Sequence, residues 1–419
     1  MEQKKPAFLV LLPNSPSQQM QTKPITKYTT LLSLYLAQSI PMSFFSTVMP
    51  VIMRTENFSL TSIGLIQLIK LPWIIKFLWA PLVDKTATDL KQYKNWILFS
   101  ELFYALVIFS IAFLNIETHF TTIIVFMLIA FTASATQDIA TDAFAILILK
   151  EKERGFGNSM QSAGTFLGTL TGSGVLLIIY HYFGWSFLLG GLALFVLLAL
   201  IPLYFYKTKE HSKPKAAKVI TMKDIYFFFT QEGIGKRLIL LVFFYSGIIG
   251  ILTMIKPWLV DLGFNIKEIG LISGIYGAAA GALMAFAAGF IIKSIGKKNA
   301  LRLVAFLGVV SGIYFVWLSS FVPNLTQLLP AILLLWGTYG MASVIIYTIS
   351  MDIVRDGREG TDFTIQIAIT HLSSLLIAVG SGKVAQSIGY SGLFKIELLM
   401  AILVLIFASF LYKPSLKNQ

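Results

Sequence analysis

The sequence lacks cysteine entirely and is poor in histidine and in charged residues. Without cysteine the chain can form neither disulfides nor thiolate metal sites, and its four histidines are too scattered to give a metal-ligand spacing. Charged residues make up 13% of the 419 residues, against about 25% in soluble domains. Hydrophobic residues reach 56%, and the mean hydropathy is +0.77. This composition indicates a protein that crosses a membrane several times.

Apolar stretches recur along the whole chain, each close to the ~20 residues that a membrane-spanning helix needs. Charged or turn-forming residues separate them. We count twelve such stretches, at residues 29–53, 62–83, 96–114, 120–149, 156–180, 185–206, 237–260, 266–292, 301–321, 326–351, 361–386 and 389–412. The sequence therefore predicts an all-α polytopic membrane protein with twelve transmembrane helices.

Lysine and arginine are concentrated in the two tails and in the loops that follow even-numbered spans. Because these residues gather on the cytoplasmic side, both termini are predicted to be cytoplasmic. Topology alone accounts for the net charge of +13, so we expect no nucleic-acid partner. The predicted divisions are a cytoplasmic tail 1–28, a six-helix bundle 29–206, a cytoplasmic linker 207–236, a second six-helix bundle 237–412 and a cytoplasmic tail 413–419. Within the linker, the apolar stretch 225–229 predicts a short helix on the membrane surface.

Two carboxylates, Asp138 and Asp142, interrupt the fourth apolar stretch. Placing an ionised side chain inside a bilayer costs at least ~2.5 kcal/mol, so such residues usually face a polar path. A spacing of four residues puts both on one helix face. We predict that they serve coupling or gating, with H⁺ or Na⁺ as the coupling ion. A purely structural ion pair with a lysine is the alternative.

Lys70 and Lys76 lie in the second apolar stretch and are the candidates to balance these carboxylates. They are six residues apart, so they face different directions on a regular helix. Lys70 is deeper and is the better candidate for the polar path. Lys76, nearer the end of the span, could instead extend to the lipid head groups.

Four amides and one imidazole within the spans are candidate hydrogen-bonding groups for a substrate: Gln38, Gln137, Gln161, Gln366 and His371. The alternative for each is a bond to a neighbouring helix, which is the commoner use of such residues in membranes.

The two halves of the chain echo each other. Arg154-Gly155 is matched by Glu359-Gly360, and Gln161 by Gln366, both at an offset of 205 residues. Parallel halves of six spans with a substrate site between them are a transporter plan. No hydrolase, zinc-protease or nucleotide-binding motif is present, so we expect neither catalytic residues nor a cofactor.

Two longer motifs carry a family resemblance. Residues 71–84, LPWIIKFLWAPLVD, and residues 134–143, SATQDIATDA, resemble the second and fourth spans of one branch of the major facilitator superfamily. That branch contains muropeptide permeases of the AmpG type, siderophore importers of the RhtX/FptX type and acetyl-CoA transporters. The stretch 153–161 is more similar to the siderophore importers.

The resemblance also implies a loop latch, in which charged loop residues at helix ends hold the bundles together. In the first half Asp84 and Lys85 match the family's acid-base pair, while Ala80 replaces its glycine. In the second half Lys293 stands where the family has an acid. The candidate latch residues are Asp84, Lys85, Gly289, Lys293, Gly296, Lys297 and Lys298.

Together, residues and resemblance predict a monomeric secondary transporter of the inner membrane that works by alternating access. The resemblance implies import into the cytoplasm, driven by a proton gradient. The expected substrate is a bulky polar solute, either a ferric siderophore or an anhydro-muropeptide, with a nucleotide-linked acyl donor or another solute as the third choice. The alternatives from a different class are an intramembrane enzyme and a channel.

Overall fold

A computed structural model describes residues 24–55, 69–116, 118–207 and 221–411. The C-terminal tail, most of the N-terminal tail, the start of the second span and the middle of the linker lie outside the described residues. The first half contains α1 (Pro24–Ser43), η1 (Phe44–Val48), α2 (Met49–Thr55), α4 (Leu71–Ile75), η3 (Lys76–Leu78), α5 (Ala80–Thr86), α6 (Leu90–Ile111), α7 (Phe120–Ile148), η4 (Glu151–Glu153), α8 (Arg154–Leu170), η5 (Thr171–Val175), α9 (Leu176–Ala199) and α10 (Ile201–Tyr204).

The second half begins with a short helix before its first span. Its elements are α11 (Lys223–Phe229), α12 (Ile234–Phe243), α13 (Ile249–Asp261), α14 (Ile266–Ile269), η6 (Gly270–Tyr276), α15 (Gly277–Leu318), α16 (Leu325–Asp352), α17 (Glu359–Ile406) and η7 (Phe407–Leu411). The expected linker helix is therefore present as α11. Its Asp224 and Phe228 are buried, because the helix packs onto α17.

Seven helical stretches among the described residues are long and apolar enough to cross a membrane unaided. Two of them contain 52 residues, or about 78 Å at 1.5 Å per residue, against ~30 Å for a bilayer core. Each must turn back, and the turns lie at Gly296 (φ 79°) and Gly389 (φ 74°). Gly184 (φ 76°) divides the fifth pass from the sixth in the same way. With these turns, the described helices follow the expected twelve passes.

The positive φ angles explain why glycine occupies these three turns. Lack of space does not explain it, since a Cβ added at any of them would meet nothing within 4 Å. Left-handed backbone angles are unfavourable for residues that carry a Cβ. Backbone conformation rather than lack of space therefore selects glycine here.

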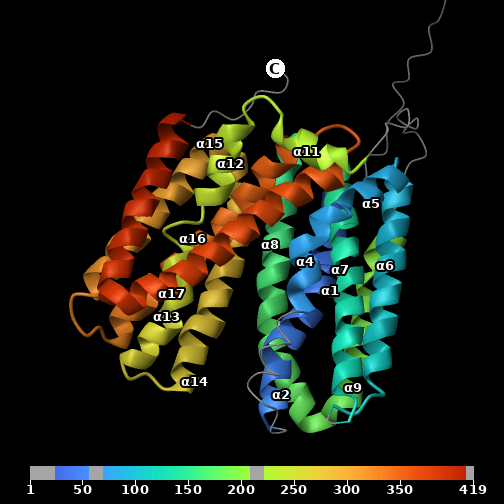
Figure 1. Ribbon diagram of the computed structural model, residues 1–419, viewed down its shortest axis with the longest axis horizontal. Coiled ribbons are helices and arrows are strands. Elements are labelled where there is room, and N and C mark those ends of the chain that lie inside the picture. The colour runs from blue at the N-terminus through green and yellow to red at the C-terminus, as the bar shows by residue number, and fades with distance from the viewer. Residues whose placement is uncertain (1–23, 56–68, 117, 208–220, 412–419) are drawn as a thin grey trace, which may run out of the picture.

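The two six-helix bundles lie side by side and meet at one end (Figure 1). This end carries the loops around residues 84–89, 149–154, 293–298 and 352–359, and we call it the basic face. A shared hydrophobic core lies there, in which Met351 and Phe363 of the second bundle pack with Ile139 and Phe144 of the first.

Away from the basic face, the first bundle has a hydrophobic core of its own. Phe44, Phe45 and Phe131 belong to this core, which contains no residue of the second bundle among those described. The outer helices α2 and α9 have no extensive packing with α13 or α14 in the described part of the chain. The bundles are therefore closed on each other at the basic face and separate at the opposite end.

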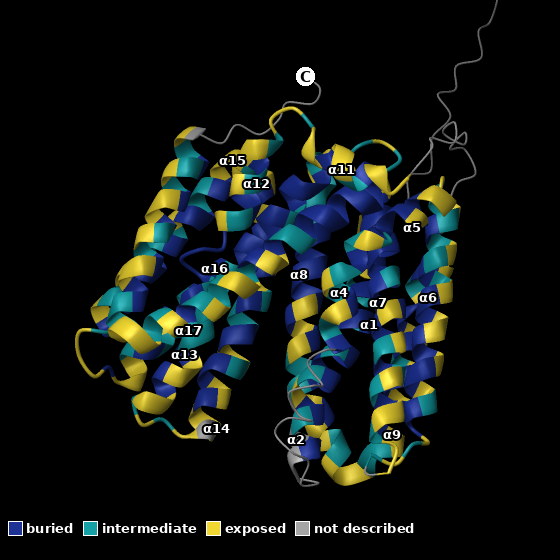
Figure 2. Ribbon diagram, in the orientation of Figure 1, coloured by how far each residue is buried: buried dark blue, intermediate teal, exposed yellow. Residues whose placement is uncertain are grey.

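Exposed residues lie along the outside of both bundles (Figure 2), and many of them are large and apolar. Phe99, Phe113, Leu283 and Phe410 are among the most exposed. A soluble monomer rarely exposes apolar surface on this scale, whereas lipid covers it at no cost.

Close packing of span 5 on span 1 gives a direct test of the fold. A Cβ at Gly172 would lie 2.5 Å from the carbonyl oxygen of Ile40 and 2.6 Å from Cβ of Ser43. We expect Gly172→Val to destabilise the protein by about 1–3 kcal/mol, since an overpacked contact against backbone cannot relax easily. Thermal unfolding in detergent measures the effect. Gly191→Val is the matched control, because nothing lies within 4 Å of its Cβ; equal losses in both variants would contradict this packing.

Candidate functional site

Asp138 is held inside the first bundle by side chains from two other spans. Its carboxylate forms an ion pair with Nζ of Lys76 and accepts a hydrogen bond from Nε2 of Gln38 at 2.9 Å. Asp138 and Lys76 are only 3% and 2% exposed. Nζ of Lys76 also lies 4.9 Å from the ring centre of Trp73. A charge pair so deeply buried persists because each ion is matched by the other and by further hydrogen bonds.

Asp142 lies one turn further along α7 and has different partners. Its Oδ1 accepts hydrogen bonds from the hydroxyl of Tyr35 at 2.8 Å and from Nε2 of Gln161 at 3.3 Å. The two carboxylates therefore share one helix face but differ in charge environment. Asp138 is paired with a cation, whereas Asp142 is bound by neutral donors.

The second span bends at Lys76, which explains why this lysine rather than Lys70 forms the pair. Helix α4 ends at Ile75, the 3-10 turn η3 begins at Lys76, and α5 starts with Pro81 near its N-terminus. These changes alter the rotation per residue. A prediction from residue spacing on an ideal helix therefore gives the wrong direction for the Lys76 side chain. The alternative in which Lys76 extends to the head groups is wrong. Lys70 lies half-buried at the start of α4.

The second bundle brings His371 and Tyr347 to this network. Helix α17 packs against η3 and α7. The exposed side chain of His371 lies within electrostatic range of Lys76 and Asp138. Tyr347 of α16 is within range of both carboxylates. The aspartates therefore lie on the surface where the two bundles meet.

Several buried amide atoms around the aspartates have no hydrogen-bond partner among the described residues. They are Oε1 of Gln38, Oε1 of Gln161, and both Oε1 and Nε2 of Gln137. Because buried polar atoms are normally paired, these groups remain able to bond a polar solute.

Gln366 lies apart from this network. Its Nε2 donates to the carbonyl oxygens of Ser350 and Ile353, and its Oε1 accepts from Nε of Arg237 at 2.9 Å. These bonds join helices within the second bundle. Gln161 and Gln366, which correspond at the 205-residue offset, therefore have different surroundings.

Asp84 of the loop latch reaches across the bundle boundary to the N-terminus of α17. Its carboxylate accepts from the backbone N–H of Gly360 at 3.0 Å and of Thr361 at 2.6 Å, and from the Thr361 hydroxyl at 2.6 Å. The Tyr93 hydroxyl donates a further bond at 2.6 Å. A helix N-terminus is a favourable place for an anion. Lys85, by contrast, is exposed.

Lys297 belongs to a second inter-bundle cluster. Nζ of Lys297 lies 2.6 Å from Asp352 and 3.0 Å from Glu151, and Nη1 of Arg154 lies 2.6 Å from Asp352. A hydrogen bond from Lys297 holds the pKa of the Glu151 carboxyl below its ordinary value. Asp84 and this cluster together close the basic face.

The remaining latch candidates make no charge contacts between the bundles within the ranges that the structure describes. Gly296 forms the turn between spans 8 and 9. Gly289 provides close packing, since a Cβ there would lie 2.6 Å from Oγ of Ser159 and 2.9 Å from the Phe156 ring. Lys293 and Lys298 are exposed.

Glu101 of α6 was not a sequence candidate, yet it is the most deeply buried glutamate among the described residues. It is 0% exposed, and neither of its carboxyl oxygens has a hydrogen-bond partner in the described part of the chain. We expect Glu101→Met to raise the thermal midpoint, because an unpaired buried polar group costs about 1–3 kcal/mol. Glu397→Met is the matched control and should lower it, since Glu397 accepts from the N–H of Gly247 at 2.8 Å where span 7 is broken. A fall in both variants would contradict this reading of Glu101.

The sequence profile of the Major Facilitator Superfamily matches residues 31–376. The chain belongs to this superfamily. It is therefore a multi-pass membrane transporter, in agreement with the resemblance and with the twelve-helix fold.

Individual relatives of this superfamily member are distant. An anhydromuropeptide permease of Escherichia coli is 23% identical over 89% of this chain and 77% of its own length. An uncharacterised protein of Haemophilus influenzae is 26% identical, covering 87% of this chain and 89% of its own. Among solved structures, the human organic anion transporter MFSD10 has the same fold, with a TM-score of 0.74 and 14% identity over 93% of this chain and all of its own.

Proposed function

We propose that this transporter imports a bulky polar solute across the inner membrane together with protons. The observation that carries the proposal is the buried ion pair between Lys76 and Asp138, which lies at the boundary with the second bundle and accepts a hydrogen bond from Gln38. Intramembrane ion pairs of this kind mark ion and substrate pathways. An ion pair far from the bundle boundary would not contact a substrate bound between the two bundles.

Proton binding at Asp138 would change the charge balance of the site. A proton on this carboxylate leaves the Lys76 ammonium without its counter-ion, so the ammonium would have to find another acceptor. Asp142 is one turn away on the same helix face. Transfer of Lys76 between the two carboxylates would couple proton occupancy to the packing of spans 2 and 4. A transporter needs such a two-state element to link ion and substrate.

The described conformation fits the outward-open stage of import. If the basic face is cytoplasmic, as the lysine and arginine distribution predicts, the bundles are closed towards the cytoplasm and apart towards the outside. The exposed side chain of His371 would then be reached from outside, whereas Gln137 is buried and would become accessible only after a further rearrangement. Both termini would lie in the cytoplasm, with the chain working as a monomer.

An anhydro-muropeptide is the substrate class we favour. Its sugar and peptide amides match the unpaired donors and acceptors of Gln38, Gln137 and Gln161. The name of the Escherichia coli relative points in the same direction. The stretch 153–161, which is similar to siderophore importers, contributes Arg154 and Asn158 to contacts with the second bundle, so it says little about the substrate.

Uptake into proteoliposomes tests the proposal. Anhydro-muropeptide and ferric siderophore would be supplied side by side under an inward proton gradient, with a sodium gradient as a separate arm. We expect accumulation of the muropeptide that a protonophore abolishes. Accumulation of the siderophore alone would overturn the choice of substrate, and uptake driven only by sodium would overturn the choice of ion.

A further inference from the structure

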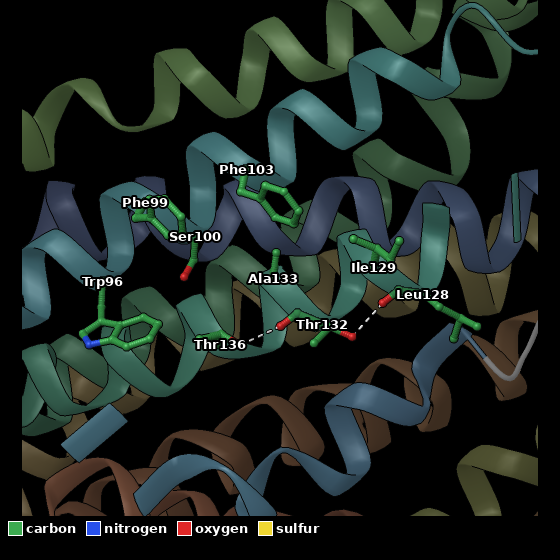
Figure 3. A pocket seen from close by; sticks show the side chains of 9 residues that line it. All are labelled: Trp96, Phe99, Ser100, Phe103, Leu128, Ile129, Thr132, Ala133 and Thr136. Atoms are coloured by element: carbon green, nitrogen blue, oxygen red, sulfur yellow. Dashed lines mark hydrogen bonds between the residues drawn. The ribbon is translucent and has the colours of Figure 1, made fainter. Parts of the chain in front are cut away.

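A groove runs along the exposed side of α6, beside α7 in its inner part and beside the end of α5 in its outer part. It consists of two adjoining pockets of about 370 and 360 Å³ that share Trp96 and Phe99. Figure 3 shows the first of them, with Phe99 and Phe103 on one side and Thr132 and Thr136 on the other. Phe99 is 70% exposed, so the groove opens to the membrane.

The length of the groove corresponds to one leaflet of a bilayer. On α6 its lining extends from Gln92 to Phe103, which are eleven residues apart. At 1.5 Å per residue this is about 16 Å, or half of the ~30 Å hydrocarbon thickness. Because α6 begins at the basic face, the groove lies in the leaflet on that side.

The lining of the groove changes from apolar to polar towards the basic face, as a phospholipid changes from acyl chain to head group. The inner pocket is mostly apolar, whereas Thr86, Gln92 and Asn95 line the pocket nearer the basic face. Trp96 lies at the junction, and its Nε1 donates to the Thr86 hydroxyl at 3.0 Å. Trp is typical of the boundary between hydrocarbon and head groups.

Basic residues outnumber acidic ones beside the polar end. Lys85, next to Thr86, and Lys91, one turn before Asn95 on the same helix face, are both exposed. The nearest acid, Asp89, caps α6 by accepting from the backbone N–H of Gln92 at 2.8 Å. The polar end therefore suits an anionic head group rather than a zwitterionic one.

We propose that this groove binds one anionic phospholipid of the leaflet at the basic face, with an acyl chain along Phe99 and Phe103 and the phosphate near Lys85 and Lys91. The site is separate from the proposed substrate path. It nevertheless contacts the same elements, since the Thr136 hydroxyl accepts from Nε1 of Trp79 at 3.1 Å and lies two residues before Asp138. A bound lipid would therefore brace spans 2, 3 and 4 together.

Native mass spectrometry of the full chain tests the proposal. The protein would be released from micelles containing equal amounts of phosphatidylglycerol and phosphatidylcholine. We expect one tightly retained phosphatidylglycerol and a preference of at least about tenfold, as a surface lysine contributes about a fivefold preference for anionic lipid. Lys85→Gln/Lys91→Gln should remove most of the preference, while Thr132→Phe, which fills the groove, should lower retention of both lipids.

Lys293→Gln/Lys298→Gln is the matched control, because it removes two exposed charges at the same face of the other bundle. Equal retention of the two lipids by the unsubstituted protein would overturn the proposal, as would retention that Thr132→Phe leaves unchanged; either result would mean non-specific annular lipid only. A dimer that Thr132→Phe dissociates would instead assign the groove to contact between two copies of the chain. All substituted side chains are exposed, so each variant is expected to fold.

Discussion

Asp138→Asn is expected to abolish gradient-driven uptake. The asparagine amide cannot take up a proton at physiological pH. It also leaves the buried Lys76 ammonium without a counter-ion. Breaking a buried ion pair by removing one partner costs about 3–5 kcal/mol, so the thermal midpoint should fall as well. Uptake into proteoliposomes and thermal unfolding of the same preparation measure the two effects.

A double variant separates coupling from structural support. Lys76→Met/Asp138→Leu removes both charges and keeps similar volume, a change that is often neutral or stabilising for a buried pair. We expect it to restore the thermal midpoint but not uptake. Restored uptake in the double variant would show that the pair is only a structural support. Asp261→Asn is the control for acid-to-amide exchange, because Asp261 is exposed and bonds only Tyr390 among the described residues.

Asp84→Ala/Arg154→Ala is expected to open the basic face. The substitution removes the four hydrogen bonds that Asp84 accepts from Tyr93, Gly360 and Thr361, together with the contact between Arg154 and Asp352. Hydrogen bonds to charged groups contribute about 1.5–3 kcal/mol each, and about 1.4 kcal/mol changes an equilibrium tenfold. The ratio of closed to open molecules should therefore fall by at least about tenfold.

The absence of cysteine makes this opening directly measurable. Lys152→Cys and Lys298→Cys are exposed positions on the two bundles at the basic face, and no native thiol competes for a spin label. Pulsed electron paramagnetic resonance should give a short distance between the two labels in the otherwise unsubstituted chain. The distance should be longer in the double alanine variant. An unchanged distance distribution would show that hydrophobic packing alone closes this face. Lys293→Ala, an exposed latch candidate, is the control and should leave the distances as they are.

Protonation of Glu151 should act in the same direction but more weakly. Because the pKa of Glu151 lies below its ordinary value of 4.5 in the closed state, its contribution to closure is complete above that value. This contribution is lost as the pH falls through the lowered pKa. Glu151 is mostly exposed, so solvent screening keeps the effect small. Glu151→Gln, which imitates the protonated carboxyl, should therefore lengthen the spin-label distances less than the double alanine variant does.

Polar residues inside apolar spans were the part of the site that could be predicted. Asp138, Asp142, Gln38 and Gln161 stand out against their surroundings, and the structure brings all four together. Glu101 is equally conspicuous as a charge in an apolar stretch, but it lies only five residues after the start of the third predicted span. A carboxylate so near the end of a span is compatible with a position at the membrane surface. Only the structure shows that Glu101 is buried inside the bundle.

Charges in the loops could not be assigned partners from the sequence. Lysines and arginines at the basic face predict orientation, which uses their number and not their contacts. Arg154, Asp352 and Lys297 are 55 to 198 residues apart, and they meet only because the two bundles close on each other.

The sequence by itself determined the number of spans, the two halves and the helix that carries the carboxylates. These features depend on hydropathy and local spacing, since a bilayer requires long apolar helices whose backbone bonds are satisfied within each helix. Tertiary structure alone decided which lysine pairs with Asp138, that Gln366 lies apart from the site, and which face is closed. Such contacts depend on the bend at Lys76 and on the packing of one bundle against the other, and neither leaves a periodic signal in the sequence.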